Sequence, residues 1–373
     1  MKELRDILER VDRQAAGERA ILATVVDVRG SGYRLAGARM LIDETGRSIG
    51  SVSGGCLESD VLERAKSVLK TGKPTIVVYD STADDNSVFG LQMGCRGVVR
   101  ILLEPADNRE LFDHIRATFE RRKASTVATL ISANGKSAEY IGDRFYRQNG
   151  DVCGPVLPGV YDATLMPRLG EALDEALRER RSTMVNYTIE GDELEFFVEV
   201  IEPPISAVVF GAGHDAIPLV TFAKQLGWNV TVVDRRPLYA TPSRFPDADN
   251  VIPAHAEDLD DQVFSEENGV AIVMTHHFES DREIVRRLVG SQVRYIGILG
   301  PKQRTADLLK QLSETGTEIG ADFLARVHAP IGLDIGAATP ESIALSIVAE
   351  IQSVLHGRDG GFLKHRTKPI YDR

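Results

Sequence analysis

The sequence predicts an α/β protein in which an N-terminal α/β unit of two pseudo-repeats precedes a C-terminal Rossmann-like domain with a doubly wound parallel sheet. Two observations predict this fold class. Residues 20–203 contain two copies of one succession of short strands and an amphipathic helix, about a hundred residues apart. Residues 207–216 then read as an apolar strand, a glycine-rich turn and the start of a helix.

These patterns also predict the domain boundaries. The first copy is expected to span residues 1–108, and the second copy with its proline-containing linker residues 109–204. The Rossmann-like domain is expected to span residues 205–357, and a polar tail residues 358–373.

Composition excludes several classes of protein. Of 373 residues, 43% are hydrophobic and 27% charged, which is typical of globular proteins. The net charge of −11 and the lack of a basic stretch argue against a nucleic-acid or anionic-membrane partner. No apolar run approaches the roughly 18 residues of a membrane span. Three cysteines, an odd number, favour a reducing cytoplasm, and a homodimer is the default expectation for the assembly.

The elements of the two copies follow one another in the same order. The first copy has segments at 21–26, 37–42, 48–51, 75–79 and 98–103 and a helix with Val61, Leu62, Ala65, Val68 and Leu69 on one face. The second copy has segments at 126–131, 142–145, 150–151 and 154–159 and a helix with Leu165, Leu169, Leu173 and Leu177. Each copy closes on a Glu-Pro pair, Glu104–Pro105 in the first and Glu202–Pro203 in the second.

The first copy carries a candidate ligand site at the junction of a strand and a helix. Free backbone N–H groups and the positive end of a helix dipole meet at such a junction, and glycines let a ligand approach the backbone. A thiol there suits a nucleophile or a soft-metal ligand. The candidate residues are Ser53, Gly54, Gly55, Cys56 and Glu58 in this turn, and Gly94, Cys95 and Arg96 in a second glycine-containing loop.

The repeat provides an internal control for the two cysteines. Most free cysteines are small buried apolar side chains, which is the alternative interpretation. When Gly50 is aligned with Gly154, however, Cys56 falls on Val160, and the second copy lacks the loop that carries Cys95. Since the second copy needs neither thiol for packing, the control favours a functional role for both.

Two further interpretations concern the cysteines. A zinc site is disfavoured, because 39 positions separate Cys56 from Cys95 and neither has a Cys or His neighbour at ligand spacing. Cys153, in the second copy, is interpreted as structural.

The C-terminal domain opens with the spacing of a dinucleotide-binding turn. Gly211-Ala212-Gly213-His214-Asp215-Ala216 matches G-x-G-x-x-G/A, with Ala216 in the place of the third glycine. Asp234 ends the next predicted strand, 23 residues after Gly211, where a ribose 2′-hydroxyl is bound in such folds. The pattern is specific for the fold and does not establish which nucleotide binds.

The choice of ligand stays open at this point. Asp234 disfavours a 2′-phosphate, whereas the following Arg235 and Arg236 could bind one, and Asp234 could instead cap the next turn. His276 follows a later strand that points its C-terminal end at the ligand crevice, so it is either a site residue or a hydrogen-bonded packing residue.

Helix starts and one loop complete the domain. Ser280 with Glu283 reads as a capping box for a helix beginning at Asp281, and Thr339 precedes another helix start. Residues 326–336 read as a long apolar loop with an embedded acid, suited to a lid or a subunit contact.

The sequence resembles the XdhC/CoxI family of maturation factors for molybdenum hydroxylases. Five motifs carry the resemblance: residues 50–58, Met93-Gly94-Cys95, Gly211-Ala212-Gly213-His214, Met274-Thr275-His276 and residues 330–336. Family members bind the molybdenum cofactor, a molybdopterin, protect it while its terminal sulfur is installed and pass it to the apo-hydroxylase. One residue departs from the pattern: Arg96 stands where the family commonly has a glycine after its second cysteine.

The resemblance implies a cytoplasmic chaperone rather than an enzyme. Its partners would be an apo molybdenum hydroxylase of the xanthine or carbon monoxide dehydrogenase type and a cysteine desulfurase. Cys56 and Cys95 would face the metal, and the Rossmann half would contribute Gly211, Gly213, His214, Asp234, Arg235, His276 and Asp334 to cofactor binding.

Two alternatives belong to other functional classes. One is an NAD(P)-dependent oxidoreductase that uses Asp234 for the ribose and a thiol for catalysis. The sequence shows no evident general-base constellation for it. The other is a non-catalytic structural subunit of a larger enzyme.

Overall fold

The computed structural model describes residues 2–15, 17–30, 32–81, 97–107, 109–148, 150–155, 165–189, 191–264 and 269–370. The chain forms two compact units, Glu3–Pro203 and Pro204–Arg373 with Met1–Lys2. The first is built on antiparallel sheets and the second on a parallel one, which confirms the predicted α/β class with a Rossmann-like second part. None of the helices in these described ranges is both long and apolar enough to cross a bilayer.

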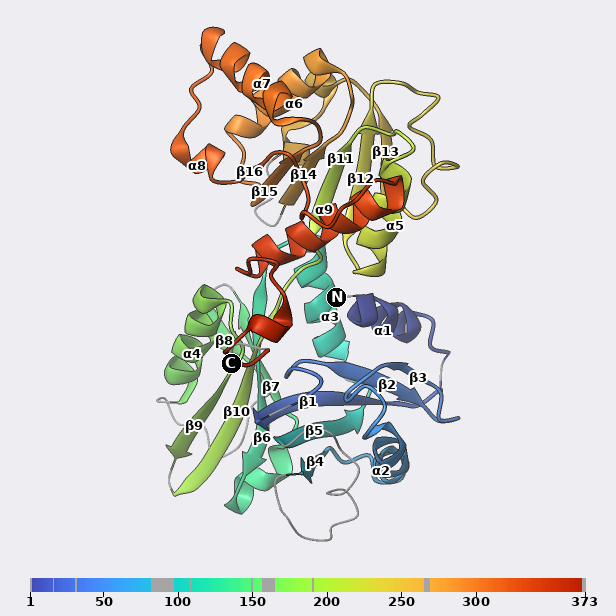
Figure 1. Ribbon diagram of the computed structural model, residues 1–373. Coiled ribbons are helices and arrows are strands. Elements are labelled where there is room, and N and C mark those ends of the chain that lie inside the picture. Colours follow the sequence, from blue (N-terminus) through green and yellow to red (C-terminus); the bar gives the residue numbers. More distant parts are fainter. Residues whose placement is uncertain are drawn as a thin grey trace. The chain divides into compact units, whose positions relative to one another are not determined.

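The N-terminal unit contains the same seven elements twice (Figure 1). The first copy consists of α1 (Lys2–Asp12), β1 (Ala20–Gly30), β2 (Arg39–Asp43), β3 (Ser48–Gly50), α2 (Glu58–Thr71), β4 (Thr75–Asp80) and β5 (Gly97–Pro105). The second consists of α3 (Arg109–Arg121), β6 (Ser125–Ala133), β7 (Arg144–Gln148), β8 (Asp151–Cys153), α4 (Leu165–Glu179), β9 (Thr183–Ile189) and β10 (Asp192–Ile201), with a short helix η1 (Gly135–Tyr140) after β6.

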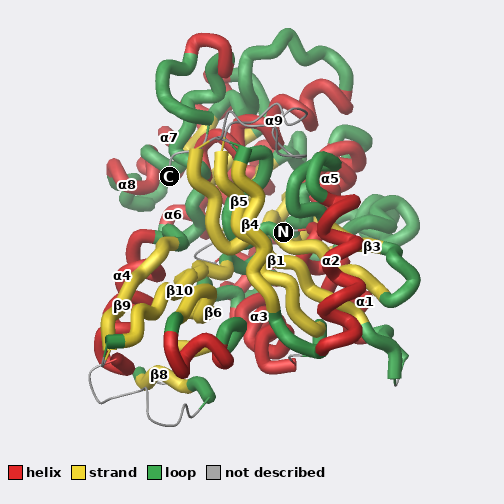
Figure 2. Tube along the Cα trace, turned by 90° about the horizontal axis from the view of Figure 1, so that it is seen from below, coloured by secondary structure: helices red, strands yellow, loops and turns green. Residues whose placement is uncertain are grey.

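The order of the strands confirms the repeat. The first sheet runs β3-β2-β1-β5-β4 and the second β8-β7-β6-β10-β9, so that equivalent strands occupy equivalent places. Figure 2 shows the strands of the molecule in yellow, seen from below. The alignment of Gly50 with Gly154 also holds. A Cβ atom on Gly50 would lie 2.3 Å from the carbonyl oxygen of Arg39, and one on Gly154 2.9 Å from that of Arg144. The leading helices α1 and α3 were not part of the predicted repeat.

Two reciprocal buried ion pairs join the copies. Arg39 on β2 donates to Glu199 on β10 at 2.7 and 2.5 Å, and Arg144 on β7 donates to Glu104 on β5 through both terminal nitrogens. All four side chains are at least nine-tenths buried. Because β2 corresponds to β7 and β5 to β10, Glu104 is equivalent to Glu199. The Glu-Pro pairs that close the two copies are therefore not equivalent to each other, since they fall three residues out of register.

The same symmetry continues into the apolar layer between the sheets. Val26 and Ile131 occupy equivalent positions, as do Leu102 and Phe197, and all four pack in one buried cluster. On the outer faces, α2 covers the first sheet and α4 the second. As predicted, Val61, Ala65 and Val68 of α2 and Leu165, Leu169 and Leu173 of α4 are buried against their sheets.

The C-terminal unit contains a six-stranded parallel sheet with the order β13-β12-β11-β14-β15-β16. Its elements are β11 (Ser206–Phe210), α5 (Ala216–Gln225), β12 (Asn229–Asp234), β13 (Asn250–Pro253), η2 (Ala256–Asp258), η3 (Asp261–Phe264), β14 (Gly269–Val273), α6 (Phe278–Val289), β15 (Tyr295–Ile298), α7 (Lys302–Glu314), α8 (Ala321–Leu324), β16 (Val327–His328), α9 (Pro340–Leu355) and η4 (Leu363–His365). This is the doubly wound order, in which the strands before and after the β11–β14 boundary are added on opposite sides of β11.

Alternating residues of the central strand divide the core into two layers. Ala207 and Val209 face α5 and α9, whereas Val208 and Phe210 face α6 and α7. Gly211 directly follows β11 and lies against the backbone that follows β14: its φ is +122°, and a Cβ atom would lie 2.4 Å from the carbonyl oxygen of Met274. Only glycine fits there, which explains the first residue of the glycine turn.

Two local predictions in this unit are wrong. Helix α6 begins at Phe278, and its N-cap is His277, whose side chain accepts a hydrogen bond from the backbone N–H of Ser280; Ser280 itself is not the cap. Residues 326–336 are not one loop, because Val327–His328 forms the edge strand β16 and Ile331 packs in the core. The predicted helix start at Thr339 is confirmed, and Thr339 caps α9 in a capping box with Ser342.

Removing one member of a reciprocal ion pair should destabilise the N-terminal unit strongly. Arg39→Met leaves the buried Glu199 carboxylate unpaired, so we expect a loss of about 3–5 kcal/mol in the free energy of unfolding. Arg39→Met combined with Glu199→Leu should recover most of that loss. Urea denaturation followed by circular dichroism measures both.

The matched control is Arg147→Met, which breaks a partly exposed pair with Asp174. It should cost no more than about 1 kcal/mol. The assigned role of the pair would be contradicted if the Arg39→Met/Glu199→Leu protein were as unstable as Arg39→Met. It would also be contradicted if Arg147→Met lowered the free energy of unfolding as much as Arg39→Met.

Candidate functional site

Cys56 lies exposed in the turn between β3 and α2, as the sequence predicts. The turn is compact around two glycines in the left-handed region, Gly54 with φ +79° and Gly55 with φ +119°. A Cβ atom on Gly54 would lie 2.5–3.0 Å from three ring atoms of Tyr33, whereas one on Gly55 would meet nothing within 4 Å. The backbone of the turn is therefore packed at Gly54 and open at Gly55.

Glu58 organises this turn from the first position of α2. Its carboxylate accepts the backbone N–H groups of Ser53 at 2.9 Å, Gly54 at 3.1 Å, Gly55 at 2.8 Å and Leu57 at 3.2 Å. The hydroxyl groups of Ser51, at 2.8 Å, and Ser53 also donate to it. Four of the N–H groups expected to be free at this helix start are therefore occupied, because the chain's own carboxylate takes the place of an external anion.

These hydrogen bonds determine the charge of Glu58. Burial opposes its ionisation, but the donors of Ser53, Ser51 and the turn backbone outweigh that effect and lower the pKa to about 2. Glu58 therefore stays ionised at neutral pH. It is a structural anion that shapes the loop carrying Cys56 rather than a proton donor.

The other predicted N-terminal site residues cannot be placed in the same way. Gly94, Cys95 and Arg96, together with Val160 of the internal control, lie outside the described residues. Cys153 is exposed, so it is not the buried side chain that a structural cysteine would be. It lies on a pocket of about 960 Å³ beside α3 and β7, which the sequence did not predict. Within the described ranges, no group of three or more His, Cys, Asp or Glu side chains is arranged to hold a metal ion.

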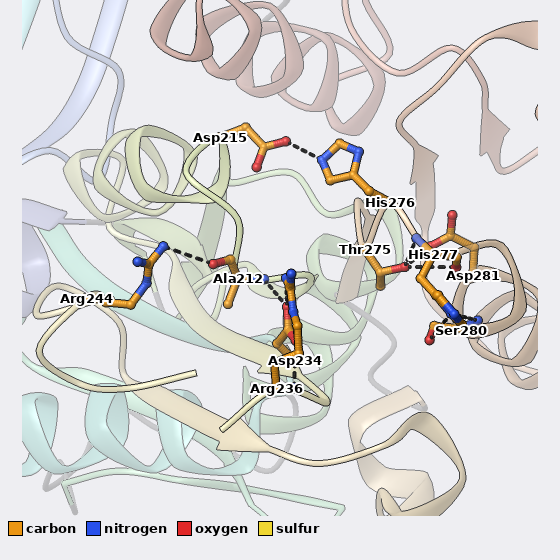
Figure 3. A network of polar contacts seen from close by, with 10 residues as sticks. All are labelled: Ala212, Asp215, Asp234, Arg236, Arg244, Thr275, His276, His277, Ser280 and Asp281. Atoms are coloured by element: carbon orange, nitrogen blue, oxygen red, sulfur yellow. Dashed lines mark hydrogen bonds and ion pairs between the residues drawn. The ribbon is translucent and has the colours of Figure 1, made fainter. Parts of the chain in front are cut away.

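The second candidate site is a pocket of about 190 Å³ at the carboxyl ends of β11, β12 and β14. Asp234, Arg235 and His276 line it, so three of the predicted residues do meet there. Figure 3 shows Asp234 and His276 with their polar contacts. His214 is exposed on the glycine turn. Asp334 is exposed on the segment before α9 and is not among the lining residues.

Asp234 is already saturated with donors. One carboxylate oxygen accepts the backbone N–H and Nε of Arg236, both at 2.9 Å, and the other accepts the N–H of Ala212 at 2.8 Å and Nη2 of Arg236 at 2.7 Å. Burial alone would raise the pKa of Asp234, but these hydrogen bonds lower it. The contact with its own residue i+2 bears out the capping alternative for this side chain.

A hydrogen-bonded contact joins the pocket residue His276 to the glycine turn. His276 adopts a left-handed φ of +58°, and its Nε2 lies 2.9 Å from the carboxylate of Asp215. Asp215 in turn lies over Gly213, where a Cβ atom would come within 2.3 Å of Oδ1. Sequence reasoning missed Asp215 and Arg236 as site residues. Their positions, inside the glycine motif and directly after the strand-ending acid, could have indicated them.

The fold and these sites define a two-unit α/β protein that presents a cysteine in a glycine turn and carries a Rossmann unit with a small polar pocket. The profile described as the XdhC and CoxI family matches residues 13–80, and that described as the XdhC Rossmann domain matches residues 207–351. The chain belongs to the XdhC and CoxI family.

Individual relatives agree with this assignment. A probable xanthine dehydrogenase subunit of Bacillus subtilis (strain 168) is 33% identical over 338 residues, which cover 90% of this chain and 92% of the relative. The molybdenum cofactor insertion chaperone PaoD of Escherichia coli (strain K12) is 22% identical over 95% of this chain and 89% of its own. A crystal structure described as a xanthine dehydrogenase from Bacillus halodurans matches with a TM-score of 0.76 and 29% identity over 98% of both chains.

Replacing Glu58 with glutamine should loosen the cysteine turn. The neutral amide accepts fewer of the turn's N–H groups, so we expect a loss of about 2 kcal/mol in the free energy of unfolding at pH 7. The pKa of Glu58 lies near 2 in the folded protein, below its ordinary 4.5. The advantage of the wild type is therefore complete above about pH 4.5 and shrinks as the pH falls toward 2.

Urea denaturation across this pH range measures the difference. Glu63→Gln, an exposed change on the same helix, is the control and should alter stability by less than about 0.5 kcal/mol. A Glu58→Gln protein as stable as the wild type at pH 7 would show that the carboxylate does not hold the turn.

Proposed function

We propose that this protein binds the molybdenum cofactor and delivers it to an apo molybdenum hydroxylase of the xanthine dehydrogenase type. Membership of the XdhC and CoxI family supports the proposal, as do the names of its relatives, one a xanthine dehydrogenase subunit and one a cofactor insertion chaperone. The observation that carries it is the exposed thiol of Cys56 on a turn whose shape the chain fixes without a ligand. We place the exchange in the cytoplasm, where thiols stay reduced.

The chemistry of the turn fits one part of the cofactor. When bound, the cofactor supplies a soft molybdenum centre on a pterin dithiolene, and thiolate is the protein ligand that suits a soft metal. Cys56 would hold that centre, and the open side of Gly55 leaves the backbone accessible beside it. The turn does not fit the cofactor's phosphate, because Glu58 already occupies four backbone N–H groups. The phosphate therefore needs donors elsewhere.

The nicotinamide-dependent alternative finds less support. A ribose needs acceptor positions on Asp234, and Arg236 and Ala212 already fill them. We therefore propose a carrier whose output is the activity of another protein, and we do not propose a redox catalyst.

Cys56→Ser should reduce the molybdenum and pterin that co-purify with the protein by about tenfold or more, because a hydroxyl is a poor ligand for a soft metal. The protein is prepared anaerobically from cells supplied with molybdate, and metal content and pterin fluorescence are measured. Cys153→Ser is the matched control, since that thiol is also exposed and should leave both unchanged.

Delivery is tested by adding loaded protein to an apo xanthine dehydrogenase. Activity should rise in proportion to the cofactor supplied, and the Cys56→Ser protein should add little. Equal cofactor loss in the Cys56 and Cys153 variants would overturn the assignment of Cys56. Multiple-turnover reduction of NAD by this protein alone would overturn the carrier proposal.

A further inference from the structure

The pocket of the Rossmann unit differs from a dinucleotide site in three ways. The first is size: its volume of about 190 Å³ is below the roughly 300–1,000 Å³ of pockets that enclose drug-sized ligands. The space suits one small group with part of a sugar or ring. It does not suit two linked nucleotides.

The second difference is the state of the acid that follows β12. A carboxylate has about four acceptor positions, and four donors fill those of Asp234. Three of these donors belong to Arg236, whose guanidinium also stacks 4.0 Å from the ring centre of Tyr239. Arg236 is thereby held on both sides. A ribose diol could bind Asp234 only by displacing Arg236, so Arg236 blocks the binding of a diol to this carboxylate.

The third difference is the place above the glycine turn, where a pyrophosphate lies in dinucleotide-binding folds. The carboxylate of Asp215 lies over Gly213 and is held there by His276. Another anion at this point would be repelled by Asp215. The turn is therefore closed to the pyrophosphate that its spacing predicts.

Positive charge gathers on the side of the pocket next to β12. Arg235 is exposed on the lining, and Arg236 binds Asp234 through its backbone N–H, Nε and Nη2, which leaves Nη1 on the guanidinium edge. In related folds an arginine at this point of the chain accommodates a phosphate on the ribose instead of its diol. Arginine also matches the geometry of phosphate oxygens with two parallel donors.

We propose that the pocket binds a phosphate monoester at Arg235 and Arg236. Arg236 sets this specificity because it occupies the acceptor positions of Asp234 that a ribose diol would need. The phosphate can come from a nucleotide or from free phosphate, and both share the same chemistry. This inference does not depend on cofactor binding at Cys56, and its test uses neither molybdenum nor a hydroxylase.

The experiment is isothermal titration calorimetry on the full-length protein with two matched probes. Adenosine 2′-monophosphate carries the phosphate, and adenosine carries the free diol in its place. The wild type should bind the monophosphate at least about tenfold more tightly than adenosine. In Arg236→Ala that preference should fall to about threefold or less, because the phosphate loses a donor and Asp234 regains free acceptor positions.

Arg286→Ala is the control: this arginine is exposed on α6, pairs with Glu283 and should leave the preference unchanged. Inorganic phosphate as competitor separates the two sources. If phosphate displaces adenosine 2′-monophosphate at concentrations near the dissociation constant of the monophosphate, the ligand is free phosphate. If displacement requires far higher phosphate concentrations, the ligand is a nucleotide. The proposal is overturned if the wild type binds adenosine as tightly as the monophosphate, if it binds neither, or if Arg236→Ala keeps the full preference.

Discussion

The hydrogen bonds from the turn backbone to the carboxylate of Glu58 are the interaction on which the presentation of Cys56 depends. Backbone N–H groups at a helix start need acceptors, and in a glycine turn a bound anion often supplies them. Here the first residue of α2 supplies them instead. The loop therefore has a defined shape before any ligand arrives, and its thiol is available for a soft ligand.

The Rossmann unit follows the same principle with other residues. Asp234 accepts the N–H of Ala212, and the carboxylate of Asp215 lies over Gly213, so carboxylates of the chain itself lie at both residues of the glycine turn. A fold usually associated with dinucleotides thus has its diol acid and its pyrophosphate position occupied. We therefore assign ligand binding in this unit to other side chains of the pocket, above all to the positively charged Arg235 and Arg236 after β12.

Much of the fold could be predicted because periodicity reports burial directly. The apolar faces of α2 and α4 and the continuous apolar run of β11 are local patterns that report which residues are buried. It was harder to predict which groups a given side chain binds in the folded protein. Glu58 was identified as a site residue, but its role as internal anion depends on how the turn folds back on it. The N-cap at His277 depends on how its turn folds, and the equivalence of Glu104 and Glu199 depends on ion pairs between distant strands, neither of which composition and spacing report.

The pKa of Glu58 tests the central claim most directly. The carboxyl carbon of this residue can be followed by NMR in protein labelled with ¹³C at glutamate, with Glu58→Gln identifying the resonance. We predict that the signal stays that of an ionised carboxylate from pH 7 down to about pH 3, consistent with a pKa near 2. A midpoint near the ordinary value of 4.5 would contradict the claim, because it would mean that the turn's N–H groups do not bind this carboxylate.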